Sequence, residues 1–116
     1  MAAGDITSTK RYTNLIEFAG EPLVAEDDAL TVHAHSSEYT FAVNVAGGAN
    51  FTLALECSFN DSDTWFTIDT SKTINTNGQF AYFYTGKAAS KIRVRIDSIS
   101  SGTPSVTPYI AVAYHG

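Results

Sequence analysis

The chain has 116 residues, which suffices for one domain with its own hydrophobic core but not for two independent domains. Hydrophobic residues make up 44% of it and charged residues only 16%, below the usual quarter, so we expect a lightly charged surface. The net charge of −5 argues against binding to a nucleic-acid backbone, which requires a clustered basic surface, and no stretch approaches the roughly 20 apolar residues that span a bilayer. We therefore expect neither nucleic acid nor membrane as a partner.

Residues 1–28 differ from the rest of the chain. They carry six acidic residues against two basic ones, and hence most of the negative charge. Their apolar residues follow no clean period, and Gly20-Glu21-Pro22 interrupts them. We interpret 1–28 as an extended N-terminal arm, which either lies along its own sheet or reaches a neighbouring subunit, and 29–116 as a β-sandwich domain. No signal peptide is visible, so the protein is expected to be made and folded in a reducing cytoplasm.

From residue 29 onward, apolar and polar side chains alternate in short runs, as in strands with one buried face. The expected strands cover residues 30–35, 39–45, 51–59, 65–68, 79–85, 91–97 and 105–114. This pattern predicts an all-β fold, an antiparallel two-sheet sandwich of seven or eight strands with jelly-roll or Greek-key connections, with a small barrel as the alternative.

The connections between these strands carry their own signals. Ser36-Ser37 is expected to be a turn, and 86–90 a loop. Asn60–Asp63 predicts the turn of a hairpin between 51–59 and 65–68, in which Cys57 and Phe59 face inward, and Asn77-Gly78 is a second hairpin signal. Pro108 cannot donate a ladder hydrogen bond, so the last strand is expected at a sheet edge or with a bulge.

Residues able to support catalysis or bind metal are few. His33 and His35 share the outward face of one strand, but no third metal ligand is recognisable, and the remaining histidine is His115. Asn60–Asp63 with Asp69 gathers oxygen atoms but lacks the Gly and Glu of an EF-hand loop. Carboxylates such as Glu56 are expected to be solvated, and the sequence has no phosphate-binding Gly-rich loop, Cys-x-x-Cys or Gly-x-Ser-x-Gly. We predict no catalytic residues, no bound metal, no cofactor and no enzymatic activity.

Two kinds of residue are candidates for binding. A basic strand with Lys91, Arg93 and Arg95 is either a solvated face or an ion-pairing surface for an acidic partner, such as the acidic arm of another copy. Aromatic residues on both faces of three strands, with Phe83 and Tyr109 on the faces opposite the core, form an interface or a ligand platform unless the arm covers them.

The candidate residues follow from these features. Those for partner binding are Lys10, Arg11, Tyr12, Leu15, Phe18, Arg93 and Arg95. Those for stacking on a ligand are Trp65, Tyr82 and Tyr84.

Several stretches resemble β-sandwich modules of tailed-bacteriophage virion proteins, namely Ser58–Asp69, Gly78–Phe83 and Lys91–Ile96. In those modules a turn of the Asp-Gly-x-x-Trp kind precedes a strand, and a later strand reads Ile/Val-Arg-Val; here Ser62 stands where Gly is usual. The start of the chain, with Met1–Thr7 and Lys10-Arg11, is similar to that of small phage head proteins.

The resemblance implies a structural virion component, either a capsid decoration (cement) protein or a tail or head–tail adaptor subunit. It implies a major capsid protein or another virion protein as partner, a homo-oligomer or symmetric array, and a place in the virion after assembly in the host cytoplasm. It transfers no catalytic residues. The alternative from another class is a carbohydrate-binding module that uses exposed aromatic rings.

Overall fold

The computed structural model describes residues 2–114, which form eight strands and no helix, and hence no helix able to cross a membrane. All strand pairs are antiparallel, in the order β1-β2-β8-β3-β7-β4-β5, with β6 also paired to β4. The strands are β1 (Ile6–Tyr12), β2 (Leu15–Gly20), β3 (Ala29–Ala46), β4 (Asn50–Ser58), β5 (Phe66–Thr67), β6 (Lys72–Ile74), β7 (Gly78–Ser101) and β8 (Ser105–Ala113).

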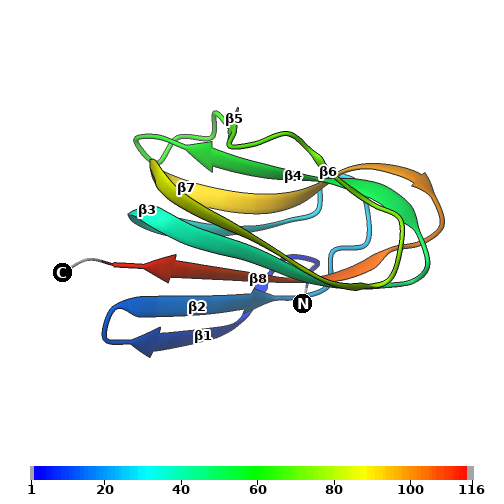
Figure 1. Cartoon of the computed structure of the whole chain (residues 1–116), viewed down its shortest axis with the longest axis horizontal. Coiled ribbons are helices and arrows are strands. Elements are labelled where there is room, and N and C mark those ends of the chain that lie inside the picture. Colours follow the sequence, from blue (N-terminus) through cyan, green and yellow to red (C-terminus); the bar gives the residue numbers. More distant parts are fainter. Residues whose placement is uncertain (1, 115–116) are drawn as a thin grey trace.

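The sheet folds into two layers because the long strands β3 and β7 belong to both (Figure 1). In the first layer, β1, β2 and β8 continue into residues 38–46 of β3 and 78–85 of β7. In the second layer, residues 29–33 of β3 lie beside residues 91–101 of β7, which pair in turn with β4. The antiparallel two-sheet sandwich expected from the sequence is thereby confirmed.

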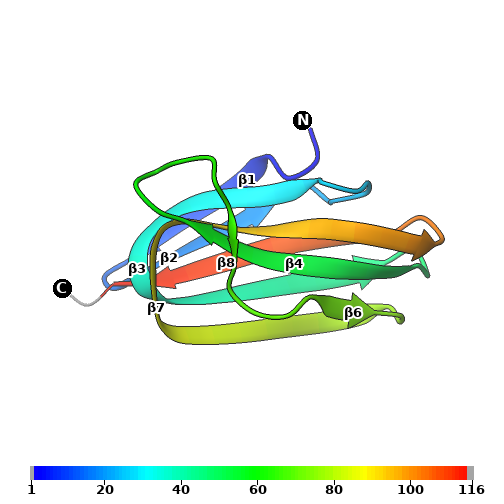
Figure 2. The same ribbon diagram turned by 90° about the horizontal axis from the view of Figure 1, so that it is seen from above.

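Both long strands bend at the same end of the molecule (Figure 2). The β3–β7 register shifts between His33 and Glu38, and His35 has a positive φ of 46°. Opposite this point, Gly86 has a positive φ of 72°. A Cβ added there would meet no atom within 4 Å, so glycine is favoured here for its backbone conformation and not because space is short. The turn expected at Ser36-Ser37 and the loop expected at 86–90 are therefore bends within continuous strands, because pairing resumes on both sides.

The core lies between the layers, and the bend in β3 keeps its apolar face turned inward. Even-numbered residues Leu30 and Val32 are buried before the bend, whereas odd-numbered residues such as Phe41 and Val43 are buried after it. Because side chains alternate across a strand, an irregularity that changes the parity is needed to point both halves at one core. The facing residues of β4, led by Phe51 and Leu55, close the core from the second layer.

The N-terminal segment lies along its own sheet. β1 and β2 form a hairpin whose second strand pairs with β8 from Leu15 to Ala19, so these residues are strands rather than an irregular arm. Farther along, Leu23 exchanges backbone hydrogen bonds with Val106, and the Asp27 N–H donates to the carbonyl of Ile96. The division of the chain into two parts at residue 28 stays a prediction.

Two expectations about connections are corrected. β8 is an interior strand between β2 and β3, not an edge. The N–H of Val106, two residues before Pro108, points toward the β2 side, where it donates to Leu23, so the nitrogen of Pro108 faces the same side. Pro108 is tolerated there because the pairing of β8 with β2 stops at the Ala19–Tyr109 pair. The Asn77-Gly78 step joins β6 to β7, but β6 pairs with β4 and not with β7, so this step crosses between layers and makes no hairpin.

The hairpin of β4 and β5 is confirmed, with Glu56 opposite Thr67 and Cys57 opposite Phe66. Cys57 is buried, as expected. Phe59 is 47% exposed instead of inward-facing, because β4 ends at Ser58 and the ring then packs beside Phe66 with a centroid distance of 5.5 Å.

Candidate functional site

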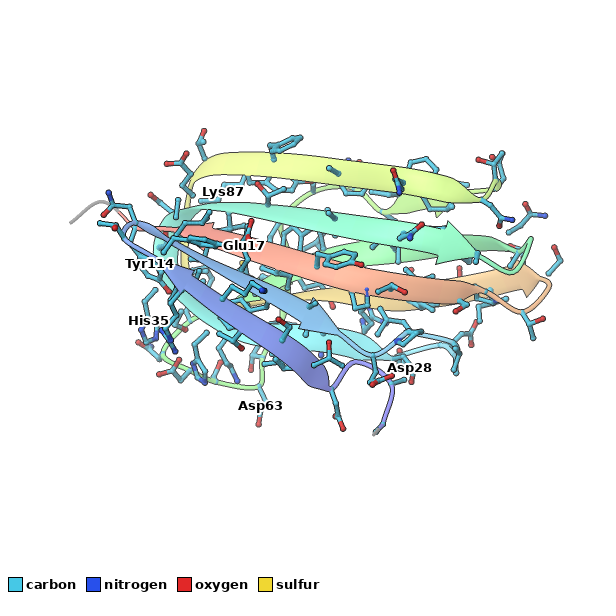
Figure 3. All side chains as sticks on the ribbon, turned by 90° about the horizontal axis from the view of Figure 1, so that it is seen from below. Glu17, Asp28, His35, Asp63, Lys87 and Tyr114 are labelled. Atoms are coloured by element: carbon cyan, nitrogen blue, oxygen red, sulfur yellow. The ribbon has the colours of Figure 1, made fainter. Side chains whose placement is uncertain are left out.

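The outward surface of the first layer carries aromatic side chains that the core does not cover, and we call it the Tyr109 face. It is made by the outward residues of five adjacent strands, β1, β2, β8, β3 and β7, which lie side by side in Figure 3. The strand register arranges these residues in rows across the sheet. The central row is Ser8, Ala19, Tyr109, Ala42 and Ala81, and the next row is Lys10, Glu17, Ala111, Thr40 and Phe83.

Tyr109 stands between small neighbours. Ala19 is its partner on β2 and Ala42 its partner on β3, so neither side chain reaches up to cover the ring. As a result two grooves adjoin the ring, one of about 450 Å³ that extends from β1 across β8 to β3, and one of about 360 Å³ between β8 and β7. Tyr109 is 43% exposed and Phe83, in the neighbouring row, is 75% exposed. The face is therefore largely apolar, grooved on either flank of Tyr109 and open to a partner.

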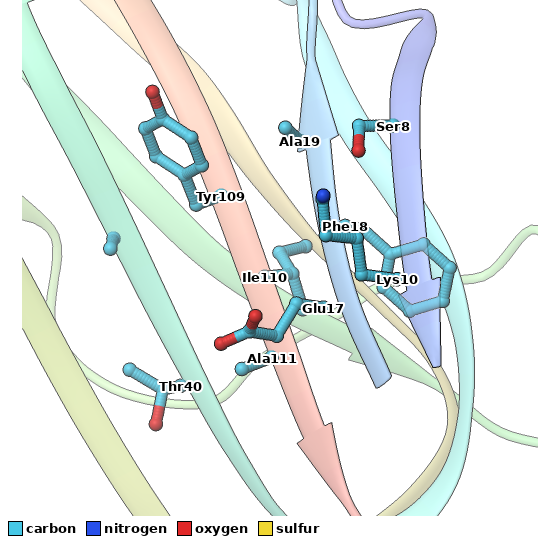
Figure 4. Close-up of a pocket in the computed structure, with 10 residues that line it drawn as sticks. Ser8, Lys10, Glu17, Phe18, Ala19, Thr40, Tyr109, Ile110 and Ala111 are labelled. Atoms are coloured by element: carbon cyan, nitrogen blue, oxygen red, sulfur yellow. The ribbon is translucent and has the colours of Figure 1, made fainter. Parts of the chain in front are cut away.

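Polar groups border the larger groove. Figure 4 shows the Glu17 carboxylate and the Tyr109 ring on the same side of the sheet, with Thr40 across the groove. Lys10 and Glu17 are register partners, yet within residues 2–114 neither takes part in a salt bridge. The Tyr109 ring can stack on a ligand or a protein surface. The Glu17 carboxylate, the Lys10 ammonium and the Thr40 hydroxyl beside it can make directed hydrogen bonds with the same partner.

The structure brings part of the predicted partner-binding set to this face. Lys10 lies in the groove, and Tyr12 and Leu15 lie opposite each other in a further row of the same surface. Arg11 lies between Lys10 and Tyr12 in the edge strand β1, so it is on the opposite face of that strand, where it is exposed. Phe18 points the other way, because its ring packs against the core cluster.

Arg93 and Arg95 lie elsewhere, on the outward side of the second layer, and their charges are already paired. Both donate through Nε to Oε1 of Glu56, at 2.8 and 2.9 Å, and Arg95 also reaches Asp27 at 2.7 Å and Asp97 at 3.1 Å. An acidic residue of the N-terminal segment thus pairs with the basic strand within one chain.

Glu56 is only 8% exposed, which corrects the expectation that it is solvated. Burial acts to raise the pKa of Glu56, but the hydrogen bonds and charges of Arg95 and Arg93 outweigh it and hold the pKa below its ordinary value. The carboxylate is therefore a fixed structural anion.

The three predicted stacking residues are less open than Tyr109. Trp65 is half-buried, with the Arg93 guanidinium 4.1 Å from its ring centre. Tyr82 is half-buried against the core, with Lys72 Nζ 5.4 Å from its ring centre. Tyr84 is 9% exposed and lies in the core, where its hydroxyl donates to Asp69 at 3.0 Å, so its ring faces are closed to a ligand.

Tyr109 and Phe83 were expected to face away from the core but were not among the candidate site residues. The signal that finds them is local, since each is a large aromatic out of phase with the buried residues of its strand. The signal that makes Tyr109 a site is not local, because its alanine neighbours come from β2 and β3.

No family model matches the chain, and no curated protein matches it. Among solved structures, it is similar to the CBM22-1 xylan-binding domain from Paenibacillus barcinonensis Xyn10C, at 11% identity, with 96% of this chain and 81% of that one covered and a TM-score of 0.48. It is also similar to the N-terminal cellulose-binding domain of Cellulomonas fimi β-1,4-glucanase C, at 11% identity, 97% and 87% coverage and a TM-score of 0.46. The Tobacco streak virus coat protein dimer matches at 8% identity, 92% and 91% coverage and a TM-score of 0.41. At these values the likenesses assign no function.

Proposed function

We propose that this chain is a non-enzymatic structural protein of a phage virion, a decoration (cement) protein that attaches to the capsid and bridges neighbouring subunits through the Tyr109 face. The observation that carries the proposal is the outward surface of five strands, on which Tyr109 and Phe83 lie exposed and uncovered by any of residues 2–114. The resemblance to phage virion modules supplies the class of partner, which is the major capsid protein or another virion protein.

The mechanism is the burial of apolar area, repeated by symmetry. Tyr109 and Phe83 are large aromatic residues on a rigid sheet, so docking them costs little conformational entropy. Small residues such as Ala42 and Ala111 leave a surface that a partner can approach closely. A symmetric array presents many copies of one patch, and linked contacts of modest affinity then add up to stable attachment. A tail or head–tail adaptor subunit would use the same surface.

Co-sedimentation with purified phage particles tests the proposal. The double substitution Tyr109→Ala with Phe83→Ala is expected to weaken binding by about tenfold or more, since exposed aromatic anchors dominate such interfaces. Phe66→Ala is the matched control, because Phe66 is 51% exposed but lies in β5 of the second layer. Unchanged sedimentation of the double variant, or equal loss in the control, would remove the Tyr109 face from the mechanism.

A second candidate function is carbohydrate binding, favoured by the two grooves that leave both sides of the Tyr109 ring accessible. A sugar ring can stack on the tyrosine while Glu17 and Thr40 hydrogen-bond its hydroxyl groups. Glycan-array screening separates the two functions. Reproducible glycan binding that Tyr109→Ala abolishes and Trp65→Ala leaves intact supports the carbohydrate-binding module. No glycan binding, together with sedimentation on particles, supports the structural role.

A further inference from the structure

Three side chains that can ligate a metal ion meet at the bent end of the sandwich. His33 and His35 come from β3, and Asp61 comes from the connection between β4 and β5. One ligand atom from each lies within 4.8 Å of the other two, and all three residues are exposed. From the sequence, no third metal ligand was recognisable beside these two histidines. In the structure Asp61 is the third candidate ligand, although it lies 26 residues from His35 in the chain.

The fold holds this arrangement from two sides. The bend in β3 gives His35 its positive φ of 46°, and the two rings stand edge to face with centroids 5.9 Å apart. Asp61 also has a positive φ, of 52°, and its backbone N–H donates to Oγ of Ser90 at 3.0 Å. The Ser90 hydroxyl in turn donates to the carbonyl of Ser58 at 3.0 Å. The backbone of Asp61 is thus anchored to β7 and β4 independently of the histidines.

The two distances from Asp61 to the histidines are longer than good direct hydrogen bonds and match the spacing of two ligands on one ion. Oδ1 of Asp61 lies 3.4 Å from Nδ1 of His33 and 3.5 Å from Nε2 of His35. Good N–H···O hydrogen bonds are shorter, about 2.7–3.2 Å. Around a tetrahedral ion with bonds of about 2.0–2.1 Å, neighbouring ligand atoms lie roughly 3.3–3.4 Å apart.

We propose that His33, His35 and Asp61 bind one divalent transition-metal ion of the zinc type. Two imidazoles and one carboxylate are ligands that zinc accepts, and an all-oxygen site for calcium or magnesium is excluded by the two nitrogens. Three protein ligands leave a fourth position for water or for a group of a partner. The ion would fix the β4–β5 connection to β3.

The charged groups around the site are compatible with a cation. Lys91 is the register partner of His33, but its Nζ is held 3.3 Å from Asp63 and 5.4 Å from the centre of the Trp65 ring. An open groove lined in part by His35, Asn60 and Ser90 gives solvent access beside the site.

Titration calorimetry of the untagged full chain with zinc chloride tests the proposal. We expect saturable binding of one ion per chain in the micromolar range or tighter. His33→Ala, His35→Ala and Asp61→Ala should each weaken it by about tenfold or more, since removal even of an outer partner of a metal ligand costs about 10- to 100-fold. All three side chains are exposed, so the variants should fold, which circular dichroism verifies.

Two substitutions serve as matched controls. His115→Ala removes the remaining histidine, which lies outside the described residues, and Asp5→Ala removes an exposed carboxylate of the N-terminal segment that accepts a hydrogen bond from the Ala2 amide. Both should bind zinc within about twofold of the parent, and zinc should raise the thermal midpoint of the parent and the controls but not of the three ligand variants. Absence of saturable micromolar binding, or binding that the ligand substitutions leave unchanged, overturns the proposal.

Discussion

At the scale of single residues, two phenylalanines have different roles: Phe41 stabilises the core, and Phe83 is available for contact with a partner. Phe41 is fully buried between the layers, where its ring contacts those of Tyr39 and Tyr84, whereas Phe83 projects from the outer face of the neighbouring strand. The same side chain therefore has opposite surroundings on adjacent strands of one layer. Alternation along each strand decides which of them enters the core.

Replacing each phenylalanine by alanine should show this difference. Phe41→Ala leaves a cavity and is expected to lower the free energy of unfolding by about 3–5 kcal/mol. Phe83→Ala removes a ring that is already in water and should change it by less than about 0.5 kcal/mol. Urea unfolding measures both, and a large loss in the Phe83 variant would contradict the exposure of that ring.

Glu56 gives the residue-scale prediction for pH. Its folded pKa is held below the ordinary 4.5, so the carboxylate stabilises the fold above that pH, and this contribution is lost as pH falls through the folded pKa. Glu56→Gln cannot titrate. We expect the parent to be more stable than the variant at about pH 7, and the difference in thermal midpoint to shrink below about pH 4.5.

Other carboxylates that titrate in acid, such as Asp69 with its pKa lowered to about 2 by Lys72, the Thr70 amide and Tyr84, are shared by both proteins and cancel in the comparison. A difference that grows on acidification would contradict the assignment.

At the scale of elements, the β1–β2 hairpin determines whether β8 is an interior strand. β2 supplies the hydrogen-bonding partner of β8 from Tyr109 to Ala113, and Phe18 packs against the core. Without the hairpin, β8 would present unpaired backbone groups along an exposed edge, which favours association between chains.

Deleting residues 1–20 should therefore destabilise the domain rather than only weaken binding to a partner. The lost burial of Phe18 alone corresponds to up to about 3 kcal/mol. We expect a lower urea midpoint and concentration-dependent self-association by size-exclusion chromatography, both compared with the full chain at the same concentration. An unchanged midpoint and a monomeric elution would show that the hairpin does not stabilise β8. Because the deletion also removes Lys10 and Glu17 from the Tyr109 face, point variants are the better probe of particle binding.

At the scale of the whole molecule, β3 and β7 join the two layers into one cooperative unit. Each contributes one half to either layer, so neither layer can open without losing strand pairs that the other needs. The residues of the core cluster come from both halves of both strands.

We expect one unfolding transition as a consequence. Trp65 fluorescence, which reports on the second layer, and far-UV circular dichroism, which reports on all strands, should give coincident urea curves. Hydrogen exchange under mild urea should then show β8 and β4 opening with the same free energy. Earlier exchange of β8 would indicate that the layers unfold separately.

The sequence by itself determined the all-β class, the approximate positions of the main strands, the buried face of most of them and the hairpin at Asn60–Asp63. It could do so because the alternation of apolar side chains is a local property, contained within the roughly four to ten residues of one strand. The same alternation marked Phe83 and Tyr109 as residues that face away from the core. The N-terminal segment, which has no clean period, and the short strand β6 were not placed by this signal.

Only the tertiary structure decided which strands are neighbours. Cross-strand contacts join residues far apart in the chain, and their register depends on the whole sheet. Such pairing buried Glu56 between two arginines, set alanines on both sides of Tyr109 and brought Asp61 to the two histidines. The candidate binding face and the proposed metal site therefore depend on contacts between distant segments. The local sequence pattern does not show which segments come into contact.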